Sequence, residues 1–218
     1  VFWLNEYHID GWRLDVADEI DPSLWTRIRY RIKSAYPDCL LLGETWGDGF
    51  SLLDEKSVDS IMNYVFRDSV RDFLARGSID AKMFNHRICQ MRSHYPEEIR
   101  QALFQPLDSH DTERFLWNCS GDIRRLKLAA LFQLCFPGAP SIYYGDEIGL
   151  NGDNDPDCRR CMEWNPAKQN ADVLSFYKKI IRIRKKNPCL RTGNIVPLVC
   201  EKMTYGYLCQ SDNQQIYV

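Results

Sequence analysis

Three carboxylates, each at the end of a short apolar run, are the side chains in this sequence best suited to chemistry. Asp15 ends the run Gly11-Trp-Arg-Leu-Asp15, Glu44 ends Cys39-Leu-Leu-Leu-Gly-Glu44, and Asp111 ends Leu103-Phe-Gln-Pro-Leu-Asp-Ser-His-Asp111. Short apolar runs of this kind are consistent with buried strands. A carboxylate at the carboxyl end of a buried strand is well placed to act as a nucleophile or as a general acid.

The environment of the first two acids predicts different charge states for them. Residues two apart on a strand point to the same face, so Arg13 and Asp15 should lie together. We expect the Arg13 guanidinium to hold the Asp15 carboxylate ionised and aimed. Glu44 follows three leucines, and an apolar setting favours the protonated form of a carboxyl group. One ionised and one protonated carboxyl group is the pair that a retaining glycosidase uses.

The spacing of the three acids predicts that they meet at one face of a parallel barrel. Asp15 and Glu44 lie about 30 residues apart, which is the length of one βα unit, and Asp111 follows after roughly two more units. They would then end the first, second and fourth strands of a repeating pattern. The carboxyl ends of the strands form the face of such a barrel that carries the chemistry.

The rest of the sequence predicts an α/β fold in which strands and helices alternate. Apolar runs predict strands at 10–15, 39–44, 57–64, 102–108 and 139–144. Helical periodicity and capping residues predict helices at 22–35, 65–76, 80–94, 122–136 and 172–186. Residues 150–170 read as a long polar loop, a length that is usually functional or disordered. From Leu190 onward, short apolar stretches and glycines predict the first strands of a β-domain.

At these residues the chain resembles the alpha-amylase family of retaining glycoside hydrolases, glycoside hydrolase family thirteen. The resemblance rests on four ordered motifs, which are Gly11-Trp-Arg-Leu-Asp15, Gly43-Glu44, Ser109-His-Asp111 and Gly138-Ala-Pro-Ser-Ile-Tyr-Tyr-Gly-Asp-Glu-Ile-Gly149. It implies that Asp15 is the catalytic nucleophile and that Glu44 is the general acid and then the base. It also implies that Asp111 is a third acid gripping sugar hydroxyls, that Arg13 orients Asp15, and that His110 donates hydrogen bonds to the same sugar.

Within that family, the sequence is most similar to the cyclomaltodextrinase, neopullulanase and maltogenic amylase group. The matching segments are 16–19, 44–46, 107–115 and 155–160. This similarity implies four more substrate-binding residues, namely Glu19, Trp46, Asp155 and Arg159. The chain departs from the group at Asp18 and Gly47, where Asn and His are usual. Both positions would line the acceptor side, so the departures concern fine specificity and not the chemistry.

Each of these binding residues also has a plainer interpretation. Glu19 would be an ordinary carboxylate at a helix end, and Trp46 would be a core side chain. Asp155 and Arg159 would form an exposed ion pair of little energetic value. For Trp164, anchoring the long loop and touching sugar are equally reasonable.

The resemblance places Asp15 on the fourth strand of the family's (β/α)8 barrel. Residues 1–188 would then form the C-terminal portion of a TIM barrel, about strands 4–8, and residues 189–218 the beginning of a C-terminal β-sandwich domain. A full barrel needs about 250 residues, so we expect a fragment of a longer enzyme. Such a fragment has open sheet edges, which favour association, for example as a homodimer.

Composition narrows the choice of partners and cofactors. The formal net charge is −2 with no basic or acidic block, which gives no support to nucleic-acid or membrane-surface binding. No apolar run reaches the ~18 residues of a transmembrane helix. The nine cysteines are best interpreted as reduced thiols of a cytoplasmic protein. Cys158-Arg-Arg-Cys161 lacks a second pair, so we predict no metal and no cofactor here, and leave calcium open for the longer enzyme.

Three functions are therefore considered. The preferred one is hydrolysis of α-1,4-glucosidic bonds in cyclodextrins, pullulan or maltooligosaccharides through a covalent glycosyl-enzyme. The second is another glucosidase or a transglycosylase of the same family, because the sequence does not set how well water competes with a sugar acceptor. The third is an inactive sugar-binding fragment, since a partial barrel has no complete active site.

Overall fold

The computed structural model describes residues 1–54 and 57–218, and its framework is a row of five parallel strands. One sheet has the order β1–β2–β3, and a second pairs β4 with β5. A parallel bridge between Met62 and Phe104 connects the two sheets. The strands are β1 (Gly11–Leu14), β2 (Leu40–Gly43), β3 (Ser60–Ile61), β4 (Phe104–Pro106) and β5 (Ala139–Ser141). Parallel strands separated by helices confirm the predicted α/β class.

Helices connect the strands, and several of them begin at a side chain that caps the first turn. The Asp21 carboxylate accepts a hydrogen bond from the Ser23 amide at 2.8 Å, and Pro22 occupies the first helical position. Asn63, Asp80 and Asn170 cap later helices in the same way. The helices are α1 (Phe2–Tyr7), α2 (Pro22–Lys33), α3 (Phe50–Asp54), α4 (Tyr64–Val70), α5 (Ala81–Ser93), α6 (Glu97–Ala102), α7 (Phe115–Asn118), α8 (Ile123–Cys135), α9 (Ala171–Lys186) and α10 (Cys189–Thr192).

Shorter helical turns complete the connections. A π-helix, η2 (Arg71–Arg76), continues directly from α4. The 3-10 turns are η1 (Ala17–Glu19), η3 (Asp146–Ile148), η4 (Asp157–Arg159) and η5 (Pro166–Lys168). None of the helices within residues 1–54 and 57–218 is long and apolar enough to cross a membrane.

All five predicted strands are shorter than the sequence suggested, and three of them differ most. The strand expected at 57–64 contains only β3, because Asn63 accepts a hydrogen bond from the Phe66 amide and starts α4 at Tyr64. The strand expected at 139–144 ends at Ser141, since Tyr143 already lies in a turn closed by the Asp146 amide. The strand expected at 102–108 is limited to β4. An additional helix, α6, follows Pro96, whose fixed φ suits a helix start.

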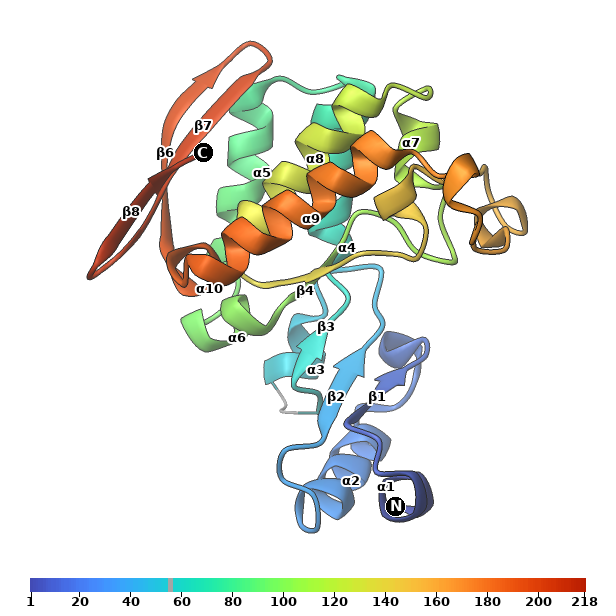
Figure 1. Cartoon of the computed structure of the whole chain (residues 1–218). Coiled ribbons are helices and arrows are strands. Elements are labelled where there is room, and N and C mark those ends of the chain that lie inside the picture. The colour runs from blue at the N-terminus through green and yellow to red at the C-terminus, as the bar shows by residue number, and fades with distance from the viewer. Residues whose placement is uncertain (55–56) are drawn as a thin grey trace.

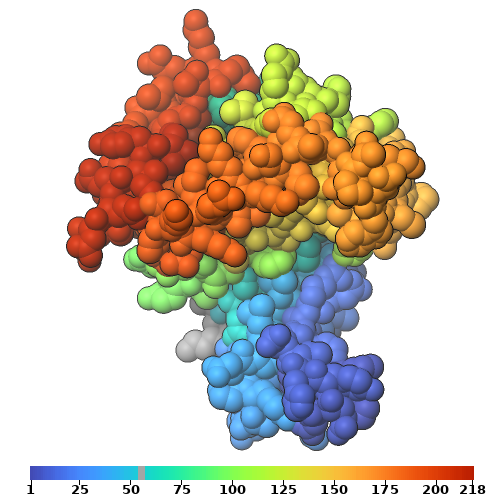
Figure 2. Space-filling model, viewed as in Figure 1, coloured from blue at the N-terminus to red at the C-terminus, as the bar shows by residue number. Residues whose placement is uncertain are grey.

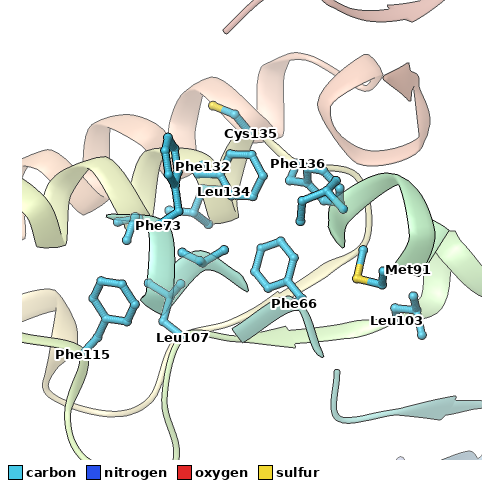
Figure 3. Close-up of a cluster of buried hydrophobic side chains, with 14 of the residues drawn as sticks. Phe66, Phe73, Met91, Leu103, Leu107, Phe115, Phe132, Leu134, Cys135 and Phe136 are labelled. Carbon is cyan, nitrogen blue, oxygen red and sulfur yellow. The ribbon is translucent and has the colours of Figure 1, made fainter. Parts of the chain in front are cut away.

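Buried aromatic and aliphatic side chains fill the space between the strands and the helices (Figure 3). Phe66 from α4 stacks on Phe132 from α8, with ring centroids 5.7 Å apart, and also contacts Phe136. Helix α9 lies along α8, as Figure 1 shows, and contributes Val173, Tyr177 and Ile180 to the same cluster. Burial of this apolar surface holds the helices against β4 and β5, so the loops that follow these strands are carried on a rigid base.

The C-terminal segment forms a separate antiparallel sheet. Its strands are β6 (Asn194–Glu201), β7 (Thr204–Ser211) and β8 (Gln214–Tyr217), in that order. Tyr207 of β7 is buried against Phe132, which attaches the sheet to the helical layer. The expected β-region begins later than predicted, because Pro188 opens the short helix α10 at Cys189–Thr192. The described residues contain one antiparallel sheet here.

The N-terminal part of the chain forms a narrower lobe below the larger body in Figure 2. It contains α1, β1, α2 and β2, with its own small core of Leu4, Ile32, Cys39 and Leu41. Strand β1 pairs only with β2, and β5 pairs only with β4, so both outer strands have an unpaired edge within residues 1–54 and 57–218.

Candidate active site

The register of β1 and β2 brings the first two acids side by side. Arg13 pairs with Leu42, and Leu14 pairs with Gly43, in a parallel ladder. Asp15 and Glu44 follow directly at the carboxyl ends of these two strands. The Glu44 amide donates to the Leu14 carbonyl at 2.9 Å, so the two backbones remain paired up to the acids. Side chains alternate along each strand, and this register therefore puts Arg13, Asp15 and Glu44 on one face.

One guanidinium, that of Arg13, connects all three acids. Its Nη1 contacts Asp15 Oδ1 and its Nη2 contacts Glu44 Oε1. The same Nη2 lies 3.8 Å from Asp111 Oδ2. Arg13 thus joins Asp15 to Glu44 through its two terminal nitrogens, as the sequence predicted for Asp15 alone.

The three carboxylates differ strongly in their exposure to solvent. The side chain of Glu44 is 5% exposed, that of Asp111 is 30% exposed and that of Asp15 is 73% exposed. Glu44 is buried, as its position after an apolar run suggests, and its carboxylate meets the Arg13 guanidinium there. Asp15 meets the same guanidinium from the solvent-exposed side.

The backbone of Val16 also contributes to the site, which the sequence analysis did not foresee. Val16 has φ 46° and ψ 44°, a left-handed conformation that is strained for a β-branched residue. In this conformation its amide donates a hydrogen bond of 3.0 Å to Glu44 Oε2. The adjoining Ala17 amide donates to the Glu44 carbonyl at 2.9 Å. The strained turn after β1 therefore fixes the orientation of Glu44.

His110 and Asp111 lie in the loop that follows β4. His110 Nε2 lies 2.9 Å from Asp111 Oδ2. The Asp111 amide donates to Ser109 Oγ at 3.2 Å, which shapes the turn that carries both residues. The side chains of His110 and Asp111 are 38% and 30% exposed, so both present polar atoms to the solvent-filled side of the site.

The long loop after β5 reaches back to the same place. Arg159 Nη2 lies 3.0 Å from Asp111 Oδ1, and Arg159 Nε lies 3.0 Å from Asp155 Oδ1. Arg159 therefore links the predicted binding pair, Asp155 and Arg159, to Asp111, although Asp111 lies 44 residues or more before them in the sequence. Trp164, farther along the loop, is 79% exposed, so burial of its ring does not anchor the loop.

Trp46 stacks on a second aromatic residue that the sequence analysis did not single out. The rings of Trp46 and Tyr64 are 4.2 Å apart and 19° from parallel, and Trp46 remains 50% exposed. The Tyr64 hydroxyl bonds to Ser109 Oγ at 2.9 Å, and burial raises the pKa of this phenol, so it stays neutral. Tyr64 follows the third strand, and its position at a strand end was the available signal.

Glu19 lies exposed at the end of η1, four residues after Asp15, and no ion pair joins it to the three acids in the described parts of the chain. The two departures from the subgroup pattern are linked to each other by Thr45. Thr45 Oγ1 donates to Asp18 Oδ2 at 2.6 Å and accepts from the Gly47 amide at 3.2 Å.

The cysteine pair in the long loop has unequal surroundings. Cys158 is fully buried, Cys161 is exposed, and both are free thiols. Burial raises the pKa of the Cys158 thiol, which disfavours the thiolate that binds metals. Within residues 1–54 and 57–218, no group of three or more His, Cys, Asp or Glu side chains is arranged to hold a metal ion.

Comparison with known proteins agrees with this geometry. The model of the alpha amylase catalytic domain matches residues 1–171, which include all three acids and the long loop. The chain belongs to the alpha-amylase family.

Curated members of the alpha-amylase family carry the subgroup names that the sequence predicted. A cyclomaltodextrinase of Thermoanaerobacter pseudethanolicus is 43% identical over 100% of this chain and 38% of its own length. Neopullulanase 2 of Thermoactinomyces vulgaris is 48% identical over 100% of this chain and 37% of its own length. The chain therefore spans less than two fifths of these relatives.

Solved structures of the family superpose closely. A cyclomaltodextrinase structure has a TM-score of 0.96 at 42% identity and covers 100% of this chain and 38% of that chain. The cyclic alpha-maltosyl-(1→6)-maltose hydrolase of Arthrobacter globiformis, in complex with its cyclic sugar, has a TM-score of 0.95 at 31% identity. That match covers 99% of this chain and 49% of that chain.

Proposed function

We propose that the enzyme to which this chain belongs hydrolyses α-1,4-glucosidic bonds in cyclodextrins, pullulan or maltooligosaccharides and retains the anomeric configuration. The observation that carries the proposal is the pair of carboxylates, Asp15 and Glu44, bound to the two terminal nitrogens of Arg13. Two carboxylates that share one guanidinium form a neighbouring pair, and this supports the pairing of a nucleophile with an acid and base that retaining enzymes use.

In this proposal Asp15 is the nucleophile and Glu44 is the acid and base. Asp15 attacks the anomeric carbon and forms a carbon–oxygen bond, while Glu44 gives its proton to the departing glycosidic oxygen. Glu44 then removes a proton from water, the water oxygen bonds to the anomeric carbon, and the bond to Asp15 breaks. The exposure of Asp15 and the burial of Glu44 support this division of roles.

The substrate-binding residues are assigned by the same reasoning. Asp111 and His110 would accept and donate hydrogen bonds to the hydroxyls of the sugar that is cleaved. Asp155 and Arg159 would bind the neighbouring glucose, and their ion pair with Asp111 supports this. Trp46 would stack on a sugar of the acceptor side, where half of its surface is exposed. Glu19 would be an outer contact on that side.

The chain is proposed to supply barrel strands four to eight. Residues 1–188 would form this part of the TIM barrel and residues 189–218 the beginning of the C-terminal β-domain. Five consecutive parallel strands and coverage of 38% of a related cyclomaltodextrinase chain support the assignment. One relative is named an intracellular maltogenic amylase, from Bacillus subtilis, which fits the predicted cytoplasmic location.

The test compares this chain with its Asp15→Asn variant. Hydrolysis of β-cyclodextrin and binding of maltotriose by calorimetry are measured, and circular dichroism establishes that both proteins are folded. We expect maltotriose to bind to both, and any hydrolysis to be confined to the chain with Asp15. A folded chain that neither hydrolyses nor binds α-glucans would contradict the proposal.

A further inference from the structure

We propose that Arg114 is a positioning residue that locks residues 150–160, here called the clamped loop, onto the segment carrying His110 and Asp111. By doing so it sets the place of Asp155 and Arg159 and thereby the affinity for sugar. This inference rests on the proposed function, because it concerns binding at the same site. None of the motif residues chosen from the sequence performs this task.

The side chain of Arg114 is completely enclosed. It is 0% exposed, and its guanidinium carbon lies 4.0 Å from the Tyr143 ring centroid and 4.6 Å from that of Tyr144. A planar guanidinium stacks on aromatic rings in a way that a lysine ammonium does not. The two tyrosines after β5 thus hold the Arg114 side chain in one orientation.

From this position Arg114 bonds to the clamped loop at two points. Its Nε donates to the Cys158 carbonyl at 2.9 Å, and its backbone amide donates to the Gly152 carbonyl at 3.0 Å. The Cys158 thiol in turn donates to the His110 carbonyl at 3.3 Å. Arg114 Nη1 also donates to the Tyr144 carbonyl. The loop after β5 is therefore attached to the loop after β4 by buried hydrogen bonds.

The contacts of Arg114 lie next to the predicted binding pair, Asp155 and Arg159. Cys158, whose carbonyl accepts from Arg114, is the neighbour of Arg159, and Arg159 lies 3.0 Å from both Asp111 and Asp155. Those ion pairs are half-exposed, and exposed pairs of this kind contribute little order by themselves. A backbone fixed beforehand lowers the entropy lost when sugar binds, so the buried contacts supply the order that the exposed ones lack.

A buried carboxyl group also contacts Arg114. Arg114 Nη1 donates a hydrogen bond to Asp146 Oδ1 at 3.3 Å, and Asp146 is itself buried. Hydrogen bonds of this kind offset the loss of hydration of the buried guanidinium. Because the Arg114 side chain donates to the Tyr144 and Cys158 carbonyls and to Asp146 at once, the forked guanidinium is needed and a single ammonium would not reach these partners.

The test uses the 218-residue chain and its Arg114→Lys variant. Amide hydrogen exchange is measured over residues 150–160, maltotriose affinity is measured by calorimetry, and the melting temperature is recorded. We expect exchange to accelerate in the clamped loop and maltotriose affinity to fall about tenfold. The matched control is Arg184→Lys, because Arg184 is also a buried arginine that donates to four carbonyls, namely those of Leu134, Phe136, Gly138 and Leu190.

The control separates positioning from general stability. Arg184→Lys should lower the melting temperature to a similar extent but leave loop exchange and maltotriose affinity within about twofold of the original chain. The proposal would be overturned if the two variants lost equal maltotriose affinity. It would also be overturned if amide hydrogen exchange over residues 150–160 were unchanged in Arg114→Lys. If the original chain does not bind maltotriose, the proposed function fails, and the exchange of the loop still decides whether Arg114 is a clamp.

A milder variant covers the case in which Arg114→Lys does not fold. The Tyr144 hydroxyl donates to the Arg160 carbonyl at 2.8 Å from a partly exposed ring, so Tyr144→Phe removes one neighbouring tie to the loop. Faster exchange confined to residues 150–160, with weaker maltotriose binding, is expected. Exchange and affinity equal to those of the original chain would contradict the clamp.

Discussion

At the scale of single residues, one arginine organises the chemistry that we propose. Arg13 contacts the exposed Asp15 and the buried Glu44 with its two terminal nitrogens. The neighbouring Val16 amide fixes Glu44 from the other side, at 3.0 Å. Two carboxylates with unlike surroundings are thereby held close together, which is the arrangement that separates a nucleophile from a proton donor.

The proposed role of Glu44 predicts a selective loss of activity in Glu44→Gln. In the enzyme with its complete barrel, β-cyclodextrin hydrolysis should fall about 10²- to 10⁴-fold, because the glycosidic oxygen then leaves without a proton. Formation of the glycosyl-enzyme from α-maltosyl fluoride should persist, since fluoride leaves without protonation. The measurement is the initial burst of fluoride that is released from α-maltosyl fluoride. Asp15→Asn is the control and should abolish turnover of both substrates. If Glu44→Gln lost the fluoride burst to the same extent as it lost β-cyclodextrin hydrolysis, the assignment would be refuted.

Gly47 offers a test of acceptor-side specificity. A β-carbon at Gly47 would meet only Thr45 Oγ1, at 3.9 Å, so the backbone has room for a side chain. Gly47→His should therefore change the unfolding free energy by no more than about 0.5 kcal/mol. The proportion of transfer products to hydrolysis products from maltotriose should change, as measured by chromatography. Gly49→His is the contrasting variant, because Gly49 has φ +58° and a β-carbon there would lie 2.6 Å from Thr45. A product ratio unaltered in Gly47→His would remove position 47 from the acceptor side.

At the scale of elements, the parts of the site that repeat along the sequence were predictable, and the parts made by tertiary contacts were not. The ends of β1, β2 and β4 follow from apolar runs, so Asp15, Glu44 and Asp111 were found from them. The shortening of β3 was missed because the Asn63 cap overrides the apolar pattern. The roles of Val16 and Arg114 depend on a backbone angle and on burial, which no local pattern reports.

The element η3 carries a buried acid whose titration should be visible in stability. Burial raises the pKa of Asp146, and the neighbouring Asp108 raises it further, while Arg114 opposes the shift. Burial also raises the pKa of Asp108, which accepts a hydrogen bond from the Phe115 amide. Other ionisable groups near this pair are Tyr177, Arg67, Cys119 and Glu147. The raised pKa therefore favours a proton on Asp146 in the folded chain.

The sign of the pH effect follows from the raised pKa. The stabilising contribution of protonated Asp146 is complete below the unfolded value of about 3.8 and is lost as pH rises through the folded value. Asp146→Asn keeps a hydrogen-bond donor toward Asp108 without a titrating proton. The free energy of unfolding is measured with urea at about pH 5 and at about pH 8. We expect it to fall less between these two pH values in the variant than in the original chain.

The control for that experiment is a carboxylate with the opposite shift. Hydrogen bonds from Arg124 lower the pKa of Asp122 to about 2. Asp122→Asn should leave the difference in stability between the two pH values as it is in the original chain, since Asp122 is ionised at both. If Asp146→Asn and the original chain show the same pH dependence, the buried carboxyl pair does not hold a proton in this range.

At the scale of the whole molecule, the N-terminal lobe presents surface that folded chains normally cover. Helix α1 displays Phe2, Trp3 and Tyr7, which are 61%, 49% and 62% exposed and contact one another. Strand β1 beside it has an unpaired edge in the described part of the chain. A contiguous apolar patch next to an open sheet edge favours association with another surface.

This surface predicts that the 218-residue chain associates with itself in solution and hydrolyses β-cyclodextrin weakly or not at all. Sedimentation should show dimers or larger species that dissociate on dilution, because apolar burial at α1 and pairing at β1 are both intermolecular. Trp3→Lys should shift the equilibrium toward monomer, since it puts a charge into the patch. Trp164→Lys is the matched control, because Trp164 is also exposed, at 79%, but lies on the long loop and not on α1. This variant should leave the association equilibrium unchanged. A chain that is monomeric and also turns over β-cyclodextrin at the rate of a full-length relative would refute the prediction.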